Sequence, residues 1–363
     1  MNDAAPMVSV VMPVHNGRKY LGSAIESILA QTWRDFEMIS VDDGSTDGSA
    51  SILKDYQQQD GRVVIITHPQ NLGIVSALNH GLKAARGKYI ARMDADDISL
   101  PERFEQQVEF LESHPQVGVV GTEAIFIDDQ DRKITRMSHP HDDLSIRWTS
   151  LLANVFFHPT VMIRRAVLVE YDLEYRADFQ SLGQDYELWL RLLEHCQAAN
   201  LKQPLLYYRV HPESISSQQK QEQRERHARL SLAAIRRSFP QIDLSVEEHA
   251  IMAAAFTGHL RASNNRWRPL LGKRYLELWR AFAVKHVGDP ALQPLKHETV
   301  VLAAKIGLFP PFQPGWLEFT RILFSVDPTW LYHFCLGFMN MIVLKFKGIR
   351  LRHLRQADLP HGT

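Results

Sequence analysis

Three aspartates fall within four consecutive positions of the chain, at Asp94, Asp96 and Asp97. They follow the strand-like stretch 87–92 and precede a helix-like stretch. Carboxylates this close repel one another unless a cation lies between them, and Mg²⁺ and Mn²⁺ prefer oxygen ligands. The carboxyl end of a strand is also where open α/β sheets bind ligands. The cluster therefore predicts a divalent-metal site. The alternative is a solvated acidic loop in which Asp97 or Ser99 caps the next helix.

A second acidic pair, Asp42 and Asp43, ends the strand-like stretch 36–41. A carboxylate at a strand end can accept hydrogen bonds from a nucleobase N–H or from ribose hydroxyls. Two adjacent aspartates exceed what a helix cap needs, so Asp43 is predicted to contact a ligand. The following residues, 44–49, are predicted to form a turn in which the side chains of residues 45–47 cap a helix.

The first apolar stretch, 8–14, runs into a turn made of His15, Asn16 and Gly17. Pro13 lacks a backbone N–H and so ends the hydrogen-bond ladder of the strand. An imidazole at this rim of the sheet is suited to stack on a nucleobase. The alternative is a turn histidine in contact with water.

Asp185 lies at the start of the helix-like stretch 183–192, in which Leu188, Trp189 and Leu192 form an apolar stripe. The helix dipole favours an ionised carboxylate in the first turn. Such a carboxylate at a cleft edge is suited to act as a general base toward a hydroxyl. The alternative is an ordinary acidic residue of a first turn, and Trp189 is expected in the core rather than as a sugar platform.

Two histidines stand next to prolines, at His158 and His211. His211 follows the strand-like stretch 205–210 and is placed to reach the metal or a phosphate; the alternative is a surface turn residue. Arg209, two residues earlier, is either a phosphate contact or a charge at the rim.

Alternating strand and helix patterns must position these residues. The expected strands are 8–14, 36–41, 63–66, 88–93, 117–120 and 124–127, and the expected helices are 19–31, 45–59 and 72–85. Strands separated by helices imply right-handed crossovers, so the fold class is α/β with a mainly parallel sheet flanked by helices.

The pattern changes after Val210. Residues 214–229 are rich in Ser, Gln, Lys and Arg, and the rest of the chain has a mostly helical pattern. We expect a domain boundary near residue 215, between a first domain of residues 1–215 and a helical C-terminal region of residues 216–363. The charged stretch is expected to be a solvated helix rather than a linker, because it contains no Gly or Pro within its alternating Glu and Arg residues.

The composition restricts the class of protein. Lys and Arg total 41 and Asp and Glu total 41 in 363 residues, so no net field attracts nucleic acid. The cysteines, Cys196 and Cys335, lie far apart, which fits a reducing compartment. The N-terminus lacks a signal-peptide pattern, and no apolar stretch reaches the roughly 18 residues of a membrane span. We expect a cytoplasmic protein.

One C-terminal segment, 330–355, has the character of a membrane-surface helix. Its apolar part, 330–344, is too short to span a bilayer and is followed by five Lys or Arg residues. That order suits a helix lying on an anionic membrane. The alternative is a core helix with a solvated basic end. For the whole region of residues 216–363, the two expected roles are membrane association and acceptor binding.

Together these stretches resemble the inverting glycosyltransferases of family 2, which have the GT-A fold. The matching segments keep the family's order from about Val8 to about Ser216. They are Val8–Gly17, Asp42–Asp47, Asn71–Gly73 followed by Ala77-Leu78-Asn79 and Gly81, Asp94–Asp97, and Gln184–Trp189. Two positions depart from the family, which commonly has Tyr at His15 and often an acidic residue at Gln184.

The resemblance implies a role for each matched position. Asp96 would bind Mn²⁺ or Mg²⁺, with Asp94 holding the ribose or supporting the metal and His211 as a further ligand. Asp185 would be the catalytic base. Asp43 would accept a hydrogen bond from the nucleobase of the donor. The full nucleotide-binding set would be Pro13, His15, Asn16, Asp43, Gly73, Asp94 and Ala95.

The same resemblance implies metal-dependent transfer of a hexosyl or N-acetylhexosaminyl group from a nucleoside-diphosphate sugar, expected to be UDP-linked. The acceptor would be a hydroxyl of a saccharide or lipid-linked molecule in cell-surface polysaccharide synthesis, with the enzyme peripheral on the inner face of the plasma membrane. Two alternatives remain. A sugar-phosphate nucleotidyltransferase needs a Gly-rich basic loop, of which residues 15–19 are a poor version. A non-catalytic nucleotide-sugar binding protein would not depend on Asp185.

Overall fold

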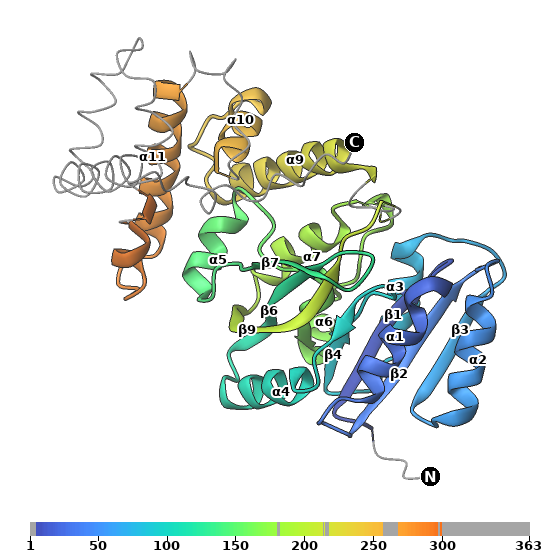
Figure 1. Ribbon diagram of the computed structural model, residues 1–363. Coiled ribbons are helices and arrows are strands. Elements are labelled where there is room, and N and C mark those ends of the chain that lie inside the picture. Colours follow the sequence, from blue (N-terminus) through green and yellow to red (C-terminus); the bar gives the residue numbers. More distant parts are fainter. Residues whose placement is uncertain are drawn as a thin grey trace, which may run out of the picture. The chain divides into compact units, whose positions relative to one another are not determined.

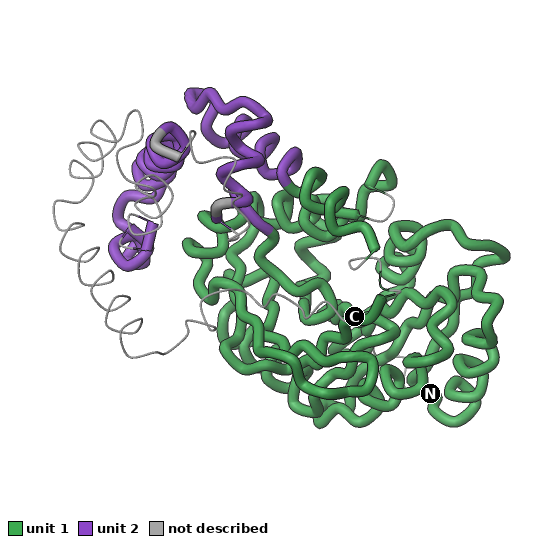
Figure 2. The backbone as a smooth tube through the Cα atoms, turned by 45° about the horizontal axis from the view of Figure 1, so that its top comes forward, with its two compact units in different colours: residues 1–150, 154–227 green, residues 151–153, 228–363 purple. Residues whose placement is uncertain are grey.

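The computed structural model describes residues 5–179, 182–212, 214, 218–256, 268–296 and 298–299. The chain divides into two compact units, shown in Figure 2: residues 1–150 with 154–227, and residues 151–153 with 228–363. Helix α9 (Lys220–Ser238) begins in the first unit and ends in the second. This helix includes residues 220–229 of the charged stretch that the sequence predicts to be helical.

The described part of the first unit is built on one nine-stranded sheet (Figure 1) with the order β3-β2-β1-β4-β8-β6-β9-β5, and β7 pairs with β6. The strands are β1 (Val8–Val14), β2 (Phe36–Asp43), β3 (Val63–His68), β4 (Tyr89–Arg92), β5 (Ile98–Ser99), β6 (Val117–Ile127), β7 (Lys133–Met137), β8 (Met162–Arg164) and β9 (Gln197–Arg209). The β3-β2-β1-β4 part is parallel, as the alternation of strands and helices predicts. Beyond β4 the sheet is mixed, because β6 pairs in parallel with β9 but antiparallel with β7 and β8.

Helices cover both faces of this sheet (Figure 1). They are α1 (Arg18–Leu29), α2 (Ser49–Gln59), α3 (Ile74–Ala84), α4 (Arg103–Ser113), α5 (Asp143–Ser150), α6 (Arg165–Glu170) and α7 (Gln184–Leu192), with short 3₁₀ turns η1 (His158–Thr160) and η2 (Ala177–Phe179). One apolar core lies under α1, α2 and α4, and a second lies under α3, α6 and α7. Val8, Val10, Met12 and Val14 of β1 face the first core and Val11 faces the second, which explains why the strand is mostly apolar.

Several predicted boundaries are wrong. The stretches 117–120 and 124–127 form the single strand β6, and β5, β7 and β8 were not predicted. Helix α2 begins at Ser49 rather than at residue 45, and its N-cap is Gly48 at φ 97°, without a side-chain cap hydrogen bond. The chain turns sharply over residues 44–48, so the residues predicted as caps lie in the turn instead.

The described elements of the second unit are helical, as expected from the sequence. They are the end of α9, α10 (Val246–Phe256) and α11 (Arg268–Lys285). Tyr275, Leu276 and Trp279 of α11 are buried. None of the described helices is long and apolar enough to cross a membrane. The segment predicted to lie on a membrane surface, 330–355, is outside the described residues.

Candidate active site

The strand order brings the predicted rim residues together. Because β1 pairs in parallel with both β2 and β4, the loops that follow these three strands emerge at one edge of the sheet. Val14 pairs with Asp42, and a Cβ placed on Gly17 would lie 3.5 Å from the Cβ of Ala95. Turn 15–17 therefore lies directly beside the acidic loop 94–97.

The acidic loop has the geometry of a cation site. Asp94, Asp96 and Asp97 each offer a carboxylate oxygen, and these oxygens lie within 4.8 Å of one another. Burial raises the pKa of Asp94, and burial with the two neighbouring carboxylates raises the pKa of Asp97 well above its usual value. Oδ2 of Asp97 is buried and has no hydrogen-bond partner in the described part of the chain. These residues fit a divalent cation, which would relieve the repulsion.

The three carboxylates differ in their partners. Asp94 forms an ion pair with Arg92, which is buried at the end of β4. Burial alone would lower the pKa of Arg92, but Asp94, together with Tyr175 and Asp97, more than offsets burial and raises the pKa. Asp96 is a third exposed, and its Oδ2 lies 3.0 Å from Nε2 of His211. Asp97 accepts a hydrogen bond of 2.7 Å from the backbone N–H of Arg209 and does not cap α4, whose N-cap is Glu102.

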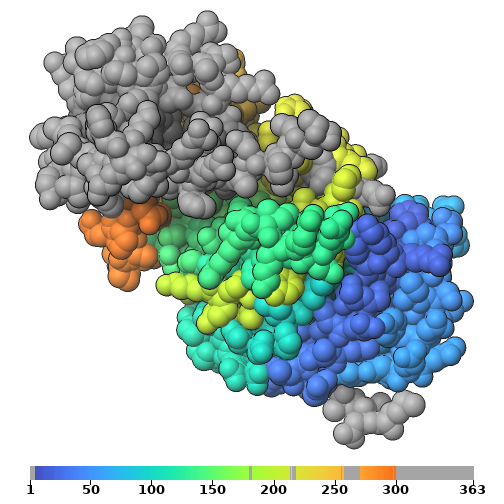
Figure 3. All heavy atoms as spheres, viewed as in Figure 1, coloured from blue at the N-terminus to red at the C-terminus, as the bar shows by residue number. Residues whose placement is uncertain are grey.

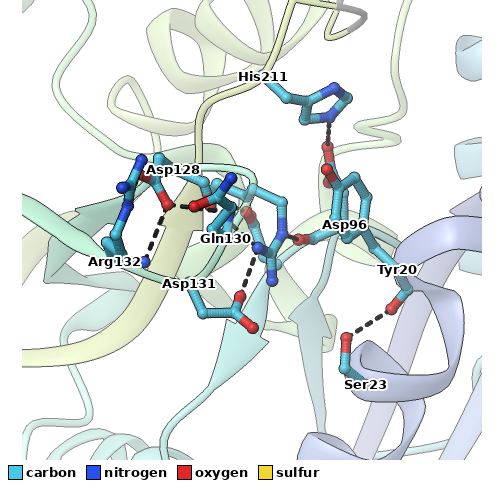
Figure 4. Close-up of polar contacts among 10 residues, drawn as sticks. Tyr20, Ser23, Asp96, Asp128, Gln130, Asp131, Arg132 and His211 are labelled. Carbon is cyan, nitrogen blue, oxygen red and sulfur yellow. Dashed lines mark hydrogen bonds and ion pairs between the residues drawn. The ribbon is translucent and has the colours of Figure 1, made fainter.

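Arg209 holds the acidic loop against a hairpin. Its Nε donates to the backbone carbonyl of Asp96 at 2.7 Å, and its Nη1 lies 3.1 Å from the carbonyl of Asp128 and 2.5 Å from Oδ1 of Asp131. Its guanidinium also lies 4.3 Å above the ring of Tyr20. Figure 4 shows Tyr20, Asp96, Asp128 and Asp131 gathered in one place. At 2 % side-chain exposure, Arg209 is a buried connection rather than a rim charge.

The hairpin involved is the turn between β6 and β7, residues 128–132. On the face drawn in Figure 3, green residues of this part of the sequence lie beside the blue N-terminal part. The contact of Arg209 with both Tyr20 of α1 and Asp131 of the turn agrees with that arrangement. The ring of Tyr20 also lies 5.3 Å from that of His211. Tyr20, His211 and Arg209 therefore lie together on one side of the acidic loop.

Asp43 organises the loop before α3. Its carboxylate accepts hydrogen bonds from the backbone N–H groups of Leu72 at 2.8 Å and Gly73 at 2.9 Å, and from Nδ1 of His68 at 2.6 Å. Three of its roughly four acceptor positions are thus occupied within the chain. Its predicted contact with a nucleobase would use the position that remains.

His15 is fixed at both ring nitrogens. Nδ1 donates to the backbone carbonyl of Asp43 at 2.8 Å, so Nε2 is the acceptor for the amides of Asn71 at 3.0 Å and Asn16 at 3.2 Å. This pattern specifies the neutral imidazole. The ring is exposed, its edge is engaged by hydrogen bonds, and its faces suit stacking. Asn16, at φ 52°, also accepts a hydrogen bond from the N–H of Thr46, so it ties the turns after β1 and β2 together.

Asp185 lies in the first turn of α7, after Gly183 at φ 77°. Its Oδ2 accepts a hydrogen bond of 2.8 Å from the amide of Asn154. The carboxylate is near enough to the acidic loop to raise the pKa of Asp94, and it raises the pKa of the buried Tyr175 in the same direction as burial does. The structure thus brings Asp185 within electrostatic range of the acidic loop, although the two lie about ninety residues apart in the sequence. Trp189 of the same helix is fully buried, as predicted.

Four residues of this site escaped prediction from the sequence: Arg92, Asn154, Tyr175 and His227. Arg92 stands two positions before Asp94, so its place in the sequence could have indicated that it belongs to the site. The other three come from separate segments. The ring of His227 packs edge-on against that of Tyr186 at 5.1 Å, and burial lowers its pKa while Asp185 opposes that shift.

The predicted nucleotide-binding and metal-binding residues therefore share one edge of the sheet. Pro13, His15, Asn16, Asp43 and Gly73 lie around the ends of β1 and β2, and Asp94, Ala95, Asp96 and His211 lie around the ends of β4 and β9. His158, also singled out in the sequence, bonds the hydroxyl of Tyr175 at 2.8 Å through Nε2. It is half-buried and packs against Trp189 of α7.

Comparison with known proteins adds sequence relatives. The family model described as "Glycosyl transferase family 2" matches residues 9–172. An uncharacterized glycosyltransferase of Haemophilus influenzae is 30% identical over 284 residues, covering 75% of this chain and 87% of the relative. The O-antigen biosynthesis glycosyltransferase WbnJ of Escherichia coli is 37% identical over 213 residues, covering 57% of this chain and 81% of WbnJ. The amylovoran biosynthesis glycosyltransferase AmsE of Erwinia amylovora is 31% identical over 214 residues, covering 58% of this chain and 79% of AmsE.

A solved structure shares the fold. The crystal structure of S. aureus TarS 1-349 in complex with UDP-GlcNAc superposes with a TM-score of 0.53 at 17% sequence identity, covering 90% of this chain and 92% of that one.

Proposed function

The chain belongs to glycosyltransferase family 2, and we propose that it transfers a sugar from a nucleoside-diphosphate sugar to a hydroxyl with inversion at the anomeric carbon and with a divalent cation. It is a glycosyltransferase of the GT-A fold, and relatives named for O-antigen and amylovoran biosynthesis support a role in polysaccharide synthesis. Family membership favours this reaction over the nucleotidyltransferase alternative.

The observation that carries the proposal is the proximity of two kinds of carboxylate. Asp185, in the first turn of a helix, acts electrostatically on Asp94 of a loop that offers three oxygens to a cation. A base and a charge-stabilising site at one edge of the sheet are the two parts that a direct displacement at the anomeric carbon requires.

Asp96 and His211 are the proposed metal ligands, with Asp94 as a ligand or as support. A bound Mn²⁺ or Mg²⁺ would offset the charge that develops on the departing nucleoside diphosphate. The ion pair with Arg92 opposes the rise that burial causes in the pKa of Asp94. Arg209 holds the backbone of Asp96 in place, so that its side chain stays directed toward His211.

The proposed donor is a UDP-linked sugar. The proposed nucleobase pocket is lined by His15 and Asp43. The fixed imidazole offers its face for stacking on the base, while Asp43 both shapes loop 71–73 and offers a remaining acceptor position. Asp185 would take the proton of the acceptor hydroxyl as its oxygen attacks the anomeric carbon opposite the leaving group. One displacement with inversion needs no covalent intermediate with the enzyme.

The first experiment is calorimetric titration of UDP, GDP and dTDP, each with Mn²⁺ and with a chelator, into wild type, Asp96→Ala and the exposed control Asp55→Ala. We expect UDP to bind only with metal, to lose that binding in Asp96→Ala and to keep it in Asp55→Ala. If UDP affinity changes neither with chelator nor in Asp96→Ala, the proposed metal site is rejected. Preferential binding of GDP or dTDP would reject the UDP donor.

Turnover of Asp185→Asn separates catalysis from simple binding. Asn is close to Asp in shape and is tolerated at a helix start. We expect the variant to fold, to bind metal and UDP like wild type, and to lose transfer to acceptor. Retained transfer would reject Asp185 as the base. A wild type that binds donor but transfers sugar to no acceptor, saccharide or lipid-linked, would favour a non-catalytic binding protein.

We further propose that residues 1–215 form the transferase domain and that segment 330–355 contacts an anionic membrane on the cytoplasmic side. The proposal rests on the apolar segment followed by basic residues. Wild type should sediment with anionic vesicles and Trp330→Glu should not. Equal sedimentation of the two proteins would reject it.

A further inference from the structure

Asn154 is tied to the proposed base. Its amide Nδ2 donates to Oδ2 of Asp185 at 2.8 Å, and its Oδ1 accepts from the backbone N–H of Val155 at 2.8 Å and of Phe156 at 3.4 Å. Val155 and Phe156 are themselves buried in the core. The Asn154 side chain is therefore held by its own backbone at one end and grips the Asp185 carboxylate at the other.

We propose that Asn154 is a positioning residue, which fixes Oδ2 of Asp185 so that Oδ1 is presented to the acceptor hydroxyl. The inference rests on the proposed role of Asp185 as the base. Among the described residues, Asn154 is the hydrogen-bond donor to this carboxylate, and Oδ1 has no hydrogen-bond partner there. A carboxylate held at one oxygen cannot rotate freely, so the other oxygen keeps the direction that proton transfer needs.

The chemical nature of Asn154 as a hydrogen-bond donor matters as well as its position. Asp185 acts electrostatically on the carboxylate of Asp94, the hydroxyl of Tyr175 and the imidazole of His227. An amide donates a hydrogen bond to a carboxylate, yet it adds no positive charge. A Lys or Arg in the same place would stabilise the carboxylate more strongly and make it a weaker base. Asn is thus suited to orient a base without neutralising it.

The test compares Asn154→Ala and Asn154→Asp with wild type in a steady-state transfer assay. Asn154→Ala removes the donor, so kcat should fall roughly 10- to 100-fold while the KM for the donor sugar and metal-dependent nucleotide binding stay unchanged. Asn154→Asp keeps the shape but puts a second carboxylate against Asp185. Its kcat should fall at least as far, and the acid limb of its kcat–pH profile should move up by about one unit or more, because the two carboxylates share a proton.

Two further measurements make the result decisive. In an Asp185→Asn background, Asn154→Ala should cause little additional loss, since the group it orients is gone. If Asp185→Asn itself keeps wild-type turnover, the proposed function fails rather than this inference. If Asp185→Asn is inactive but Asn154→Ala stays within about twofold of wild type, or the Asn154→Asp profile does not move, then Asn154 is not a positioning residue. Should Asn154→Ala not fold, the isosteric Asn154→Asp carries the test alone.

Discussion

Arg209 contacts the acidic loop from both its side chain and its backbone: its Nε donates to the carbonyl of Asp96, and its N–H donates to the carboxylate of Asp97. The same guanidinium reaches Asp128 and Asp131 of the β6–β7 turn. One buried side chain therefore joins the end of β9, the proposed metal loop and a hairpin. The position of Asp96 depends on a residue that offers no ligand atom to the metal.

Removing this connection should weaken both the fold and the metal site. Arg209→Ala removes the side-chain donor to the carbonyl of Asp96 and one of the two donors to the carbonyl of Asp128, which keeps the N–H of Asp131. The free energy of unfolding should therefore fall by about 3 kcal/mol, since hydrogen bonds to a charged group are each worth about 1.5–3 kcal/mol. Mn²⁺ affinity, measured by calorimetry, should fall about tenfold or more. Arg132→Ala is the matched control, because this arginine of the same turn is 71% exposed and pairs with Asp128. Equal effects of the two substitutions would contradict the special role of Arg209.

Gly44 is predicted to tolerate no side chain. It lies at φ 67°, and a Cβ there would meet the backbone carbon of Gln70 at 2.4 Å and the nitrogen of Asn71 at 2.6 Å. Gly44→Ala should cost about 2 kcal/mol or more in urea unfolding, because the left-handed conformation alone costs about 1–2 kcal/mol. It should also weaken UDP binding by displacing loop 70–73. Gly61→Ala, with nothing within 4 Å of its added Cβ, should change stability by less than about 0.5 kcal/mol. A Gly44→Ala protein as stable as Gly61→Ala would show that the two loops do not pack this closely.

Asp43→Asn should loosen the loop before α3. The amide replaces one acceptor oxygen by a donor, which would face the N–H of Leu72 or Gly73 or the ring of His68. We expect a loss of about 1–3 kcal/mol in the free energy of unfolding, typical of an unsatisfied buried polar group, together with weaker nucleotide binding. Asp35→Asn makes the same change of charge at an exposed residue that accepts one hydrogen bond from Met7, and it should have little effect on either measurement. Unchanged UDP affinity in Asp43→Asn would separate this loop from the nucleotide pocket.

Much of the sheet edge was predictable because its residues follow parallel strands. His15, Asp43 and Asp94 stand just beyond three strands whose apolar sequences and intervening helices are evident, and such strands point their carboxyl ends the same way. Once the strand order is β2-β1-β4, these residues must be neighbours. The helix that carries Asp185 was likewise evident from its apolar stripe.

The remaining parts depend on contacts that leave no local pattern. The amide of Asn154 meets Asp185 across 31 positions, and Arg209 meets Asp96 across 113. β8 has three residues and β5 has two. Strands this short show no recognisable alternation of apolar and polar residues in the sequence. The polar residues at 45–47 do not take the N-cap position of α2, because Gly48 takes it in a left-handed conformation.

His158 should make stability depend on pH. Burial holds its pKa well below the usual value, and the nearby Arg92 adds to that effect. The unfolded chain therefore takes up a proton near pH 6.5 while the folded protein does not. The stabilisation is present above that pH and is lost as the pH falls toward the folded-state pKa, with a slope of at most about 1.4 kcal/mol per unit. Urea unfolding at pH 7 and pH 5.5 should show that wild type loses about 1 kcal/mol more than His158→Gln, whose side chain keeps hydrogen-bonding capacity but does not titrate. Identical losses in the two proteins would mean that His158 is protonated in the folded state or titrates there as it does in the unfolded chain.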